Sequence, residues 1–594
     1  MSGIVKKAKP LIAAGVGAYV GFMVGGPSGA LRGASIGYSL GSSKKPKGGP
    51  GGGMGSTNVS TPDTGQSATA IGEQAWVPKS FGSRRAGMVL TATDLTNANH
   101  EIVQTTGEFA YSVYTLGEGP WNKINQLNYQ NIKIFKDNQT INFGQIYSFE
   151  DAVFNTDIKN MEIEFVQGNA TQSLSTMLAR VTWGYTGTGF TSGDRWYEDT
   201  DVGNGICYMV VRIKRDKNAL IRETAPNFTI DSEGKQIPEI RLQGETRQYS
   251  GGSYATGTNP AMVALDQLRS ANFGLGLNNE EIDFDAFVKF ANYCDNPGTY
   301  SDNTTVPAFE INGQFNQGSS IKDILEQISL ATGCLFADEN GIVTVKLDKL
   351  EASTTTAQVN ENNLIGNITR SEPTTSTTPN AINVTYLDSN AIETTEVVEF
   401  NNATITNEGR KEADLNLRMV QDPAHAREIA KRMLYHMRQP TYTFSLNNTG
   451  YGLDTYGISN IDDIFETTGV PASGLNMASA SNKIRIFALQ KERIQEDSNR
   501  APVKVTAKLY NDQIYTVNPQ GMTLQSSNKI SDAPGIFNIP QPQNLVISTL
   551  SDTTAKLNWT DVYQYNTLIE FKNAGAADST YIEAKLVGNG PADV

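Results

Sequence analysis

The sequence predicts a multi-domain α+β protein that is mainly β-sheet with a few packed helices. At 594 residues the chain exceeds the usual size of one hydrophobic core. Apolar residues alternate at strand spacing in many places, for example at Ile382, Val384 and Tyr386. Helical spacing occurs in a few segments, namely 259–295, 320–333 and 423–439. Hydrophobic residues make up 38% of the chain, with 23 Tyr and 23 Phe, so several cores are expected.

Residues 1–47 read as a hydrophobic arm with a regular glycine row. Pro27 interrupts this segment, so each half is too short to cross a bilayer. In a helix, such a row gives a smooth face on which another backbone packs closely. Three interpretations stay open: a secretory signal peptide, a flexible arm that packs on partner subunits, and a helical hairpin that oligomerises and meets a membrane or plugs a channel. The row comprises Gly17, Gly21, Gly25, Gly29, Gly33, Gly37 and Gly41.

A Gly/Pro/Ser-rich linker at 48–70 separates the arm from a β-rich region at 71–258. Within that region, Asp137-Asn138 lies between apolar pairs and predicts a hairpin turn. Residues 161–165 alternate apolar side chains with Glu162 and Glu164, which predicts a strand with one solvated face.

The segment 259–350 predicts a helical hairpin followed by a helix and a β-hairpin. Asn259-Pro260 is a helix start, and Gly274 and Gly276 end that helix. A second amphipathic segment then leads to Tyr293-Cys294-Asp295. The next helix begins at Ser320, and Asn340-Gly341 predicts the turn of the hairpin.

The remaining chain predicts another β region at 351–530 and a separate module at 539–594. A helix from Pro423 to Gln439 interrupts the β region, because proline starts it and Pro440 ends it. In the last module, Leu545 and Trp559 stand in the segments 540–547 and 555–559.

Composition argues against several classes of function. The formal net charge of −14 disfavours nucleic-acid binding over a broad surface, although an acidic wall suits a conduit through which DNA passes. Cys207, Cys294 and Cys334 are widely spaced and predict buried free thiols. His425 and His436 would lie about 16 Å apart on one helix, too far to share a metal. Residues 187–193 predict a plain loop. We therefore expect no enzyme activity, no metal and no cofactor.

Several of these segments resemble one family. Residues 259–295 closely resemble a stretch of the host-specificity tail tip proteins of lambda-like siphophages, the central hubs of their tails. The helix and hairpin at 320–346 and the helix entering as Ala424-His425-Ala426-Arg427 follow the order of that family, so the resemblance covers roughly residues 100–520 as spaced anchors. The family's Pro-Gly-Asp turn is missing near 461–465, where Ile461-Asp462-Asp463-Ile464-Phe465 stands instead. The arm and residues 74–87 resemble the neighbouring tail assembly protein, and residues 540–571 look like the start of a fibronectin type III domain.

The resemblance implies a hub with β-barrel domains and an incomplete fibronectin III-like sandwich at the C-terminus. It implies a virion protein at the tail tip, assembled in the host cytoplasm as a homotrimer. The implied partners are the distal tail protein, the tape measure protein, tail fibres or other tip proteins, phage DNA that passes without specific binding, and the host membrane through the arm. A secreted or surface adhesin with fibronectin modules is the alternative, and a cell-wall hydrolase is a third class that no residue pattern favours. The implied structural motif is Asn259, Pro260, Gly274, Gly276, Tyr293, Cys294 and Asp295, with Leu545 and Trp559 as fibronectin core.

Overall fold

The structure is a computed structural model of the chain, which forms two units, residues 1–533 and 534–594. It describes strands at 70–71 and between 543 and 593, and most of residues 77–527. The glycine row and the linker lie outside the described residues. None of the described helices is long and apolar enough to span a bilayer. Within 77–527 the description omits 105, 130–131, 156–157, 217–218, 222, 242–253, 316–320, 340, 352–357, 360–362, 372, 374–377, 389–392, 448–449, 451, 454–457, 462–482, 492–502 and 520–523.

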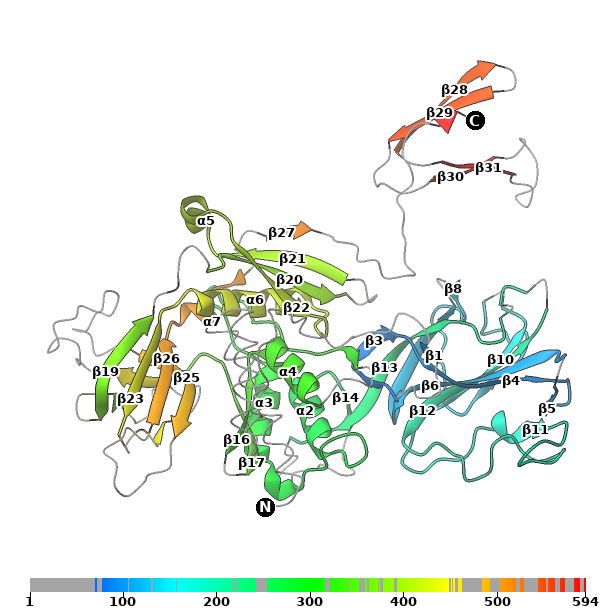
Figure 1. Cartoon of the computed structure of the whole chain (residues 1–594), viewed down its shortest axis with the longest axis horizontal. Coiled ribbons are helices and arrows are strands. Elements are labelled where there is room, and N and C mark those ends of the chain that lie inside the picture. The colour runs from blue at the N-terminus through cyan, green and yellow to red at the C-terminus, as the bar shows by residue number, and fades with distance from the viewer. Residues whose placement is uncertain are drawn as a thin grey trace, which may run out of the picture. The chain divides into compact units, whose positions relative to one another are not determined.

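The first β-module consists of two packed sheets (Figure 1, blue to cyan). The larger sheet has the order β11-β5-β4-β6-β12-β10-β9, with β1 added to β4, and the smaller has the order β14-β13-β7-β8, with β3 added to β13. One apolar core lies between the sheets and another covers the opposite face of the larger sheet. The larger sheet comprises β1 (Ala70–Ile71), β4 (Val89–Thr96), β5 (Glu101–Ile102), β6 (Phe109–Glu118), β9 (Ile146–Tyr147), β10 (Met161–Val166), β11 (Thr182–Trp183) and β12 (Ile206–Lys214). The smaller comprises β3 (Ser83–Ala86), β7 (Trp121–Tyr129), β8 (Ile132–Lys133), β13 (Phe228–Pro238) and β14 (Tyr254–Thr256).

Two local predictions in this module are wrong. Every residue of β10 is buried, because the larger sheet is covered on both faces. Glu162 pairs with Arg180 and Arg212, and Glu164 accepts hydrogen bonds from Ser175 and from the backbone after it, so neither faces water. The expected hairpin at Asp137-Asn138 is also absent from the described pairing, since Ile132 pairs back to Tyr129 and Ile141 bridges to Ile124.

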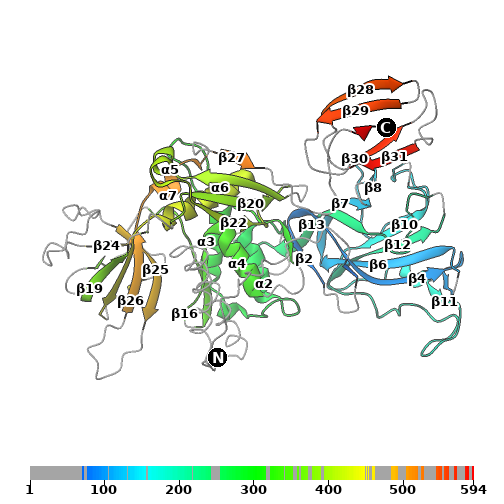
Figure 2. The same ribbon diagram turned by 45° about the horizontal axis from the view of Figure 1, so that its top comes forward.

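The central module packs helices against a hairpin and a small sheet. Helices α2 (Pro260–Arg269), α3 (Phe284–Asp295) and α4 (Ile321–Thr332) share one core with the hairpin β16 (Leu335–Glu339) and β17 (Ile342–Lys346). Helix α6 (Pro423–Met437) lies along the sheet β22-β20-β21-β27, as Figures 1 and 2 show. The strands of this sheet are β20 (Ala381–Leu387), β21 (Glu393–Glu399), β22 (Glu412–Leu417) and β27 (Leu524–Ser527). The smaller elements of this module are β15 (Gly313–Phe315), which pairs with β2 (Lys79–Phe81), η2 (Asn279–Glu281) and α5 (Asn402–Glu408), while η1 (Leu178–Arg180) belongs to the first β-module.

These helices follow from local sequence signals. Asn259 caps α2 and Asp422 caps α6 through their side chains, and each helix has proline in its first turn. The predicted helices at 260–269, 321–332 and 423–437 and the hairpin at 335–346 are therefore confirmed. The predicted cap Ser320 and the turn residue Asn340 lie outside the described residues.

The second β-module is a sheet of order β18-β24-β25-β26-β23-β19 with its own apolar core. The short helix α7 (Gln513–Thr516) follows its strand β26. The strands are β18 (Gln358–Val359), β19 (Leu364–Ser371), β23 (Thr441–Leu446), β24 (Ile458–Ile461), β25 (Lys483–Lys491) and β26 (Val503–Leu509).

The C-terminal unit contains two small sheets. One has the order β28-β29-β32 and the other pairs β30 with β31. Leu545 and Trp559 lie on β28 and β29, which pair antiparallel. The strands are β28 (Gln543–Ser551), β29 (Thr554–Thr560), β30 (Thr567–Phe571), β31 (Ile582–Val587) and β32 (Ala592–Asp593).

Candidate functional site

The helical hairpin predicted at 259–295 is tied together by Asn259. This buried side chain accepts a hydrogen bond from the N–H of Ala261 (3.0 Å) and so caps α2. Its amide nitrogen donates to the carbonyl of Ala291 (3.1 Å) and to the carboxylate of Asp295 (2.8 Å), both on α3. Asp295 also pairs with Arg241. Asn259 and Asp295, predicted from a resemblance, therefore form one direct contact between the two helices.

The remaining residues of the predicted motif also have structural roles. A Cβ added to Gly274 would lie 2.3 Å from the carbonyl oxygen of Gln267, so the turn after α2 has no room for a side chain. Gly276 has a φ of +65°, which favours glycine. Pro260 starts α2, and Cys294 is buried, which raises the pKa of its thiol. All three cysteines are free and buried, as predicted.

Tyr293 belongs to a buried polar cluster centred on Asp348, which we call the Asp348 cluster. The carboxylate of Asp348 accepts hydrogen bonds from Arg485 (2.6 Å), Tyr515 (2.6 Å) and His436 (3.1 Å). Its backbone carbonyl accepts from Tyr293 (2.8 Å) and Arg432 (3.0 Å). The cluster comprises Tyr293 on α3, Asp348 after β17, Arg432 and His436 on α6, Arg485 on β25 and Tyr515 on α7. It therefore joins the central module to the second β-module.

A second buried acid extends this cluster along α6. Glu428 accepts hydrogen bonds from Arg432 (2.6 Å), Lys431 (2.7 Å) and the hydroxyl of Tyr300 (2.8 Å). The side chains of Glu428 and Lys431 are fully buried. Charges removed from water in this way are costly unless they are paired. Both ion pairs lie within α6, and the Tyr300 hydroxyl links Glu428 to the segment that follows α3.

The electrostatics of the cluster are set by burial and by its partners. Burial alone would raise the pKa of the Asp348 carboxyl, but His436, Arg485 and Arg432 together hold it below its usual range. Burial lowers the pKa of His436, although the Asp348 carboxylate raises it, and Nε2 of the imidazole lies 3.1 Å from that carboxylate. Burial also lowers the pKa of Lys508, which donates to the carbonyl of His436, to about 7.

The first β-module is joined to α2 by another buried group, the Lys235 cluster. Lys235 on β13 pairs with Glu118 at the end of β6 and with Asp266 on α2 (2.8 Å). Burial would lower the pKa of Lys235, but Asp266 and Glu118 outweigh burial and raise it. Nothing in the sequence around Lys235 indicated a buried charge.

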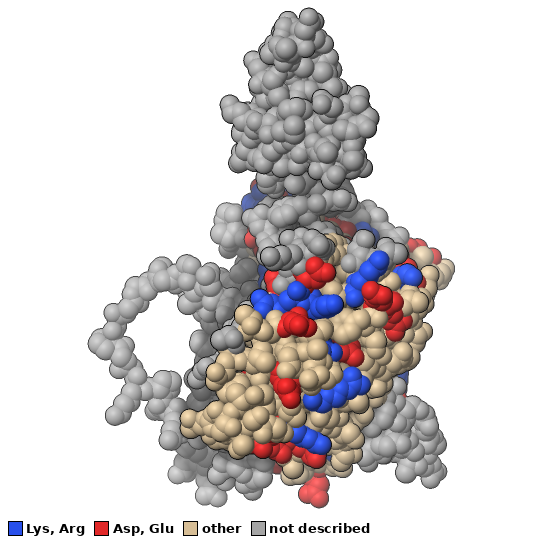
Figure 3. Space-filling view, turned by 90° about the vertical axis from the view of Figure 1, so that its right-hand side faces the viewer, with Lys and Arg blue, Asp and Glu red and all other residues tan. Residues whose placement is uncertain are grey.

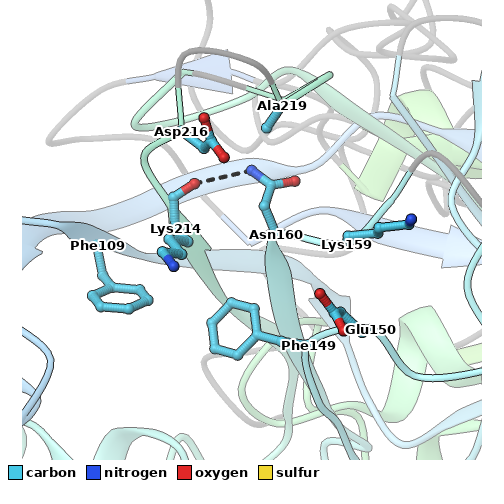
Figure 4. A pocket seen from close by; sticks show the side chains of 8 residues that line it. All are labelled: Phe109, Phe149, Glu150, Lys159, Asn160, Lys214, Asp216 and Ala219. Carbon is cyan, nitrogen blue, oxygen red and sulfur yellow. Dashed lines mark hydrogen bonds between the residues drawn. The ribbon is translucent and has the colours of Figure 1, made fainter.

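A surface pocket of about 470 Å³ lies where several strands of the larger sheet begin or end (Figure 4). Its apolar wall is made by Phe109 and Phe149, whose ring centroids are 5.9 Å apart, and Arg212 stacks on Phe109. The buried Asn160 is fixed by hydrogen bonds from its amide nitrogen to the carbonyls of Lys214 and Ile221. The other lining residues are Glu150, Lys159, Asp216 and Ala219. The eight lining residues include no His, Cys, Ser or Thr.

Surface charge does not indicate a nucleic-acid site on the face drawn in Figure 3. Lys and Arg side chains alternate there with Asp and Glu over the described part of the surface. Nucleic-acid binding needs clustered cations. The described residues also contain no group of three His, Cys, Asp or Glu side chains that could hold a metal ion.

Comparisons with known proteins point to phage tails. Residues 320–454 match the family model "Putative phage tail protein". No curated protein matches the chain. A chain from the virion of a native gene transfer agent particle is 14% identical, with a TM-score of 0.48, over 78% of this chain and 91% of that chain. The 43 kDa tail protein of prophage MuSo2 from Shewanella oneidensis is 9% identical, with a TM-score of 0.25, over 75% of this chain and 99% of that chain. The family match supports a structural protein of a phage tail.

Proposed function

We propose that this chain is the central hub of a phage tail tip. The observation that carries the proposal is the family match over residues 320–454. That segment contains α4, the hairpin β16–β17, the strands β20–β22 and α6, which supply much of the central core. The part of the chain that resembles phage tail proteins thus supplies Asp348 and α6 to the junction with the second β-module, whereas α2, which pairs with the first β-module, lies outside that segment.

The two buried clusters support a mechanical role. The Lys235 cluster fastens the first β-module to α2, and the Asp348 cluster fastens the second to α3 and α6. Breaking a buried ion pair costs about 3–5 kcal/mol, because one charge is left without its partner. Joints of this kind resist deformation, which a hub needs if it is to hold a tube shut until the tip engages a receptor.

In this proposal three copies surround the tail axis and cap the tube. The distal tail protein and the tape measure protein contact the hub on the tube side, and fibres or other tip proteins attach outside. The net charge of −14 supports passage of DNA without specific binding, because acidic walls repel phosphates. The C-terminal unit, which we take as a fibronectin III-like module, adds to the outer attachment surface.

Electron microscopy of virions that carry an epitope tag after Val594 tests the proposal. We expect antibody label at the distal end of the tail only, and three copies per tail by quantitative mass spectrometry against the distal tail protein. Label along the tube would contradict the hub proposal. A tagged protein that the host secretes and that is absent from virions would also contradict it and would favour the surface adhesin.

A further inference from the structure

The segment 511–519, which we call the strap, crosses from the second β-module to the central module. It follows β26 and contains α7, and its Ile514 and Tyr515 are buried at 1% and 4% exposure. After the strap the chain supplies β27, the edge strand that pairs with β21, and the C-terminal unit starts at Pro534. The strap is therefore the covalent path between the buried junction and that unit.

Side chain and backbone of the strap both take part in the junction. The hydroxyl of Tyr515 donates to the carboxylate of Asp348 (2.6 Å), and the guanidinium of Arg485 lies 5.1 Å from the Tyr515 ring centroid. The carbonyl oxygen of Val517 accepts a hydrogen bond from Lys431 (2.8 Å). If the strap left, Asp348 would lose a donor, and the buried ammonium of Lys431 would lose an acceptor.

The outer end of the strap is held by one short loop. The carbonyl of Thr516 accepts hydrogen bonds from the N–H (2.9 Å) and the hydroxyl (3.1 Å) of Ser301. The amide nitrogen of Asn518 donates to Asp302 (2.8 Å) and Thr304 (3.0 Å). The hydrogen bonds of Asn518 are exposed to solvent, so they are weaker than the buried contacts of Tyr515. The strength of the attachment thus rises from Asn518 towards the buried Tyr515.

We propose that the strap is a mechanical latch that tension on the C-terminal unit releases. Load on that unit first reaches β27, which is held by pairing at four residues on the edge of the sheet. It then reaches the exposed contacts of Asn518, and last the bond between Tyr515 and Asp348. Release uncovers the Asp348 cluster and frees the second β-module from the central one. The latch goes beyond the hub proposal and is a property of this chain whether or not it sits at a tail tip.

Single-molecule pulling on the full chain tests the latch. One handle is attached at the C-terminus and the other at the exposed η2 through Glu280→Cys. We expect an early extension step of roughly 60 Å, since residues 510–527 span about 3.3–3.6 Å each when extended. Separation of the second β-module should follow this step and never precede it.

Tyr515→Phe and Tyr114→Phe make a matched pair of variants. Tyr114 is equally buried, and its hydroxyl also makes one hydrogen bond, to the carbonyl of Pro226 (2.9 Å) in the first β-module. Removing the Tyr515 hydroxyl should speed strap release about tenfold, because a hydrogen bond to a buried carboxylate is lost. Tyr114→Phe should leave the rate of that step unchanged.

Hydrogen exchange gives a second measurement that needs no handles. Tyr515→Phe should raise amide exchange about tenfold in 511–519 while β23 and β26 keep their protection. The proposal fails if the second β-module separates without an earlier step. It also fails if exchange rises equally in the strap and in β26, because the strap would then be part of one cooperative unit with that sheet.

Discussion

At the scale of single residues, Asp348 carries the largest predicted effect. Asp348→Asn keeps the size of the side chain but removes the negative charge that Arg485 faces in the interior. We expect the free energy of opening at β25 and α6 to fall by about 3–5 kcal/mol, the usual cost of a buried charge without its partner. Hydrogen exchange of amides in these elements measures it. Asp414→Asn, at an exposed carboxylate of β22, is the control and should change stability by less than about 0.5 kcal/mol. Equal effects of the two changes would contradict the central role of Asp348.

The burial of Lys508 predicts that the stability of the same junction depends on pH. Its pKa is lowered by burial from 10.5 to about 7, so between pH 7 and 10.5 the unfolded chain binds a proton that the folded chain does not. Stability therefore rises with pH through this window, and the cost of the buried charge is fully present below pH 7. Opening of α6 and β26 should become less favourable from pH 7 to 8, below the ordinary cysteine pKa of about 8.5. Lys508→Met should flatten this dependence. An unchanged pH profile in the variant would assign it to another group.

At the scale of elements, the turn after α2 depends on a glycine with no free space. Gly274→Ala places a Cβ 2.3 Å from the carbonyl oxygen of Gln267, so the turn must shift. We expect a loss of about 1–3 kcal/mol in stability, as for other overpacked sites, and faster exchange in α2 and α3. Gly452→Ala is the control, since a Cβ there meets nothing within 4 Å. A stable Gly274→Ala variant with unchanged exchange would show that the turn yields without cost.

The elements also show which features the sequence could predict. Helices α2 and α6 are marked by signals within a few residues, since Asn259 or Asp422 caps each start and proline follows. The buried clusters have no such local mark. Glu118, Lys235 and Asp266 are far apart in the chain, and each one alone is typical of an exposed position. Glu162 and Glu164 were predicted to face water for the same reason. Alternation of apolar and charged residues cannot reveal that a second core covers the polar face of β10.

At the scale of the whole molecule, the described modules are held together by buried polar clusters as well as by apolar cores. The main central core includes Phe81 from β2 and Phe487 from β25, while the rest of the second β-module packs around a separate core. That separate core meets the central module at the Asp348 cluster, whose polar contacts are directional. Such contacts resist small displacements, because a displaced buried charge loses its partner. This behaviour suits a part that stays closed until a signal arrives, as the proposed hub must.

The N-terminal arm supplies the last prediction at this scale. We propose that its glycine row packs inside the trimer near the axis, as the closing element or as the first part to meet the host membrane. The double variant Gly21→Leu and Gly33→Leu places large side chains on the glycine row. Gly26→Leu, the control, places one at a glycine outside the row. The double variant should form tails of normal appearance whose infectivity is reduced at least about tenfold. The reason is that a loss of about 1.4 kcal/mol in packing free energy weakens association tenfold. Plaque counts per tail seen by electron microscopy measure the effect. Full infectivity of the double variant, or of a chain lacking residues 1–47, would show that the arm does not close the tube.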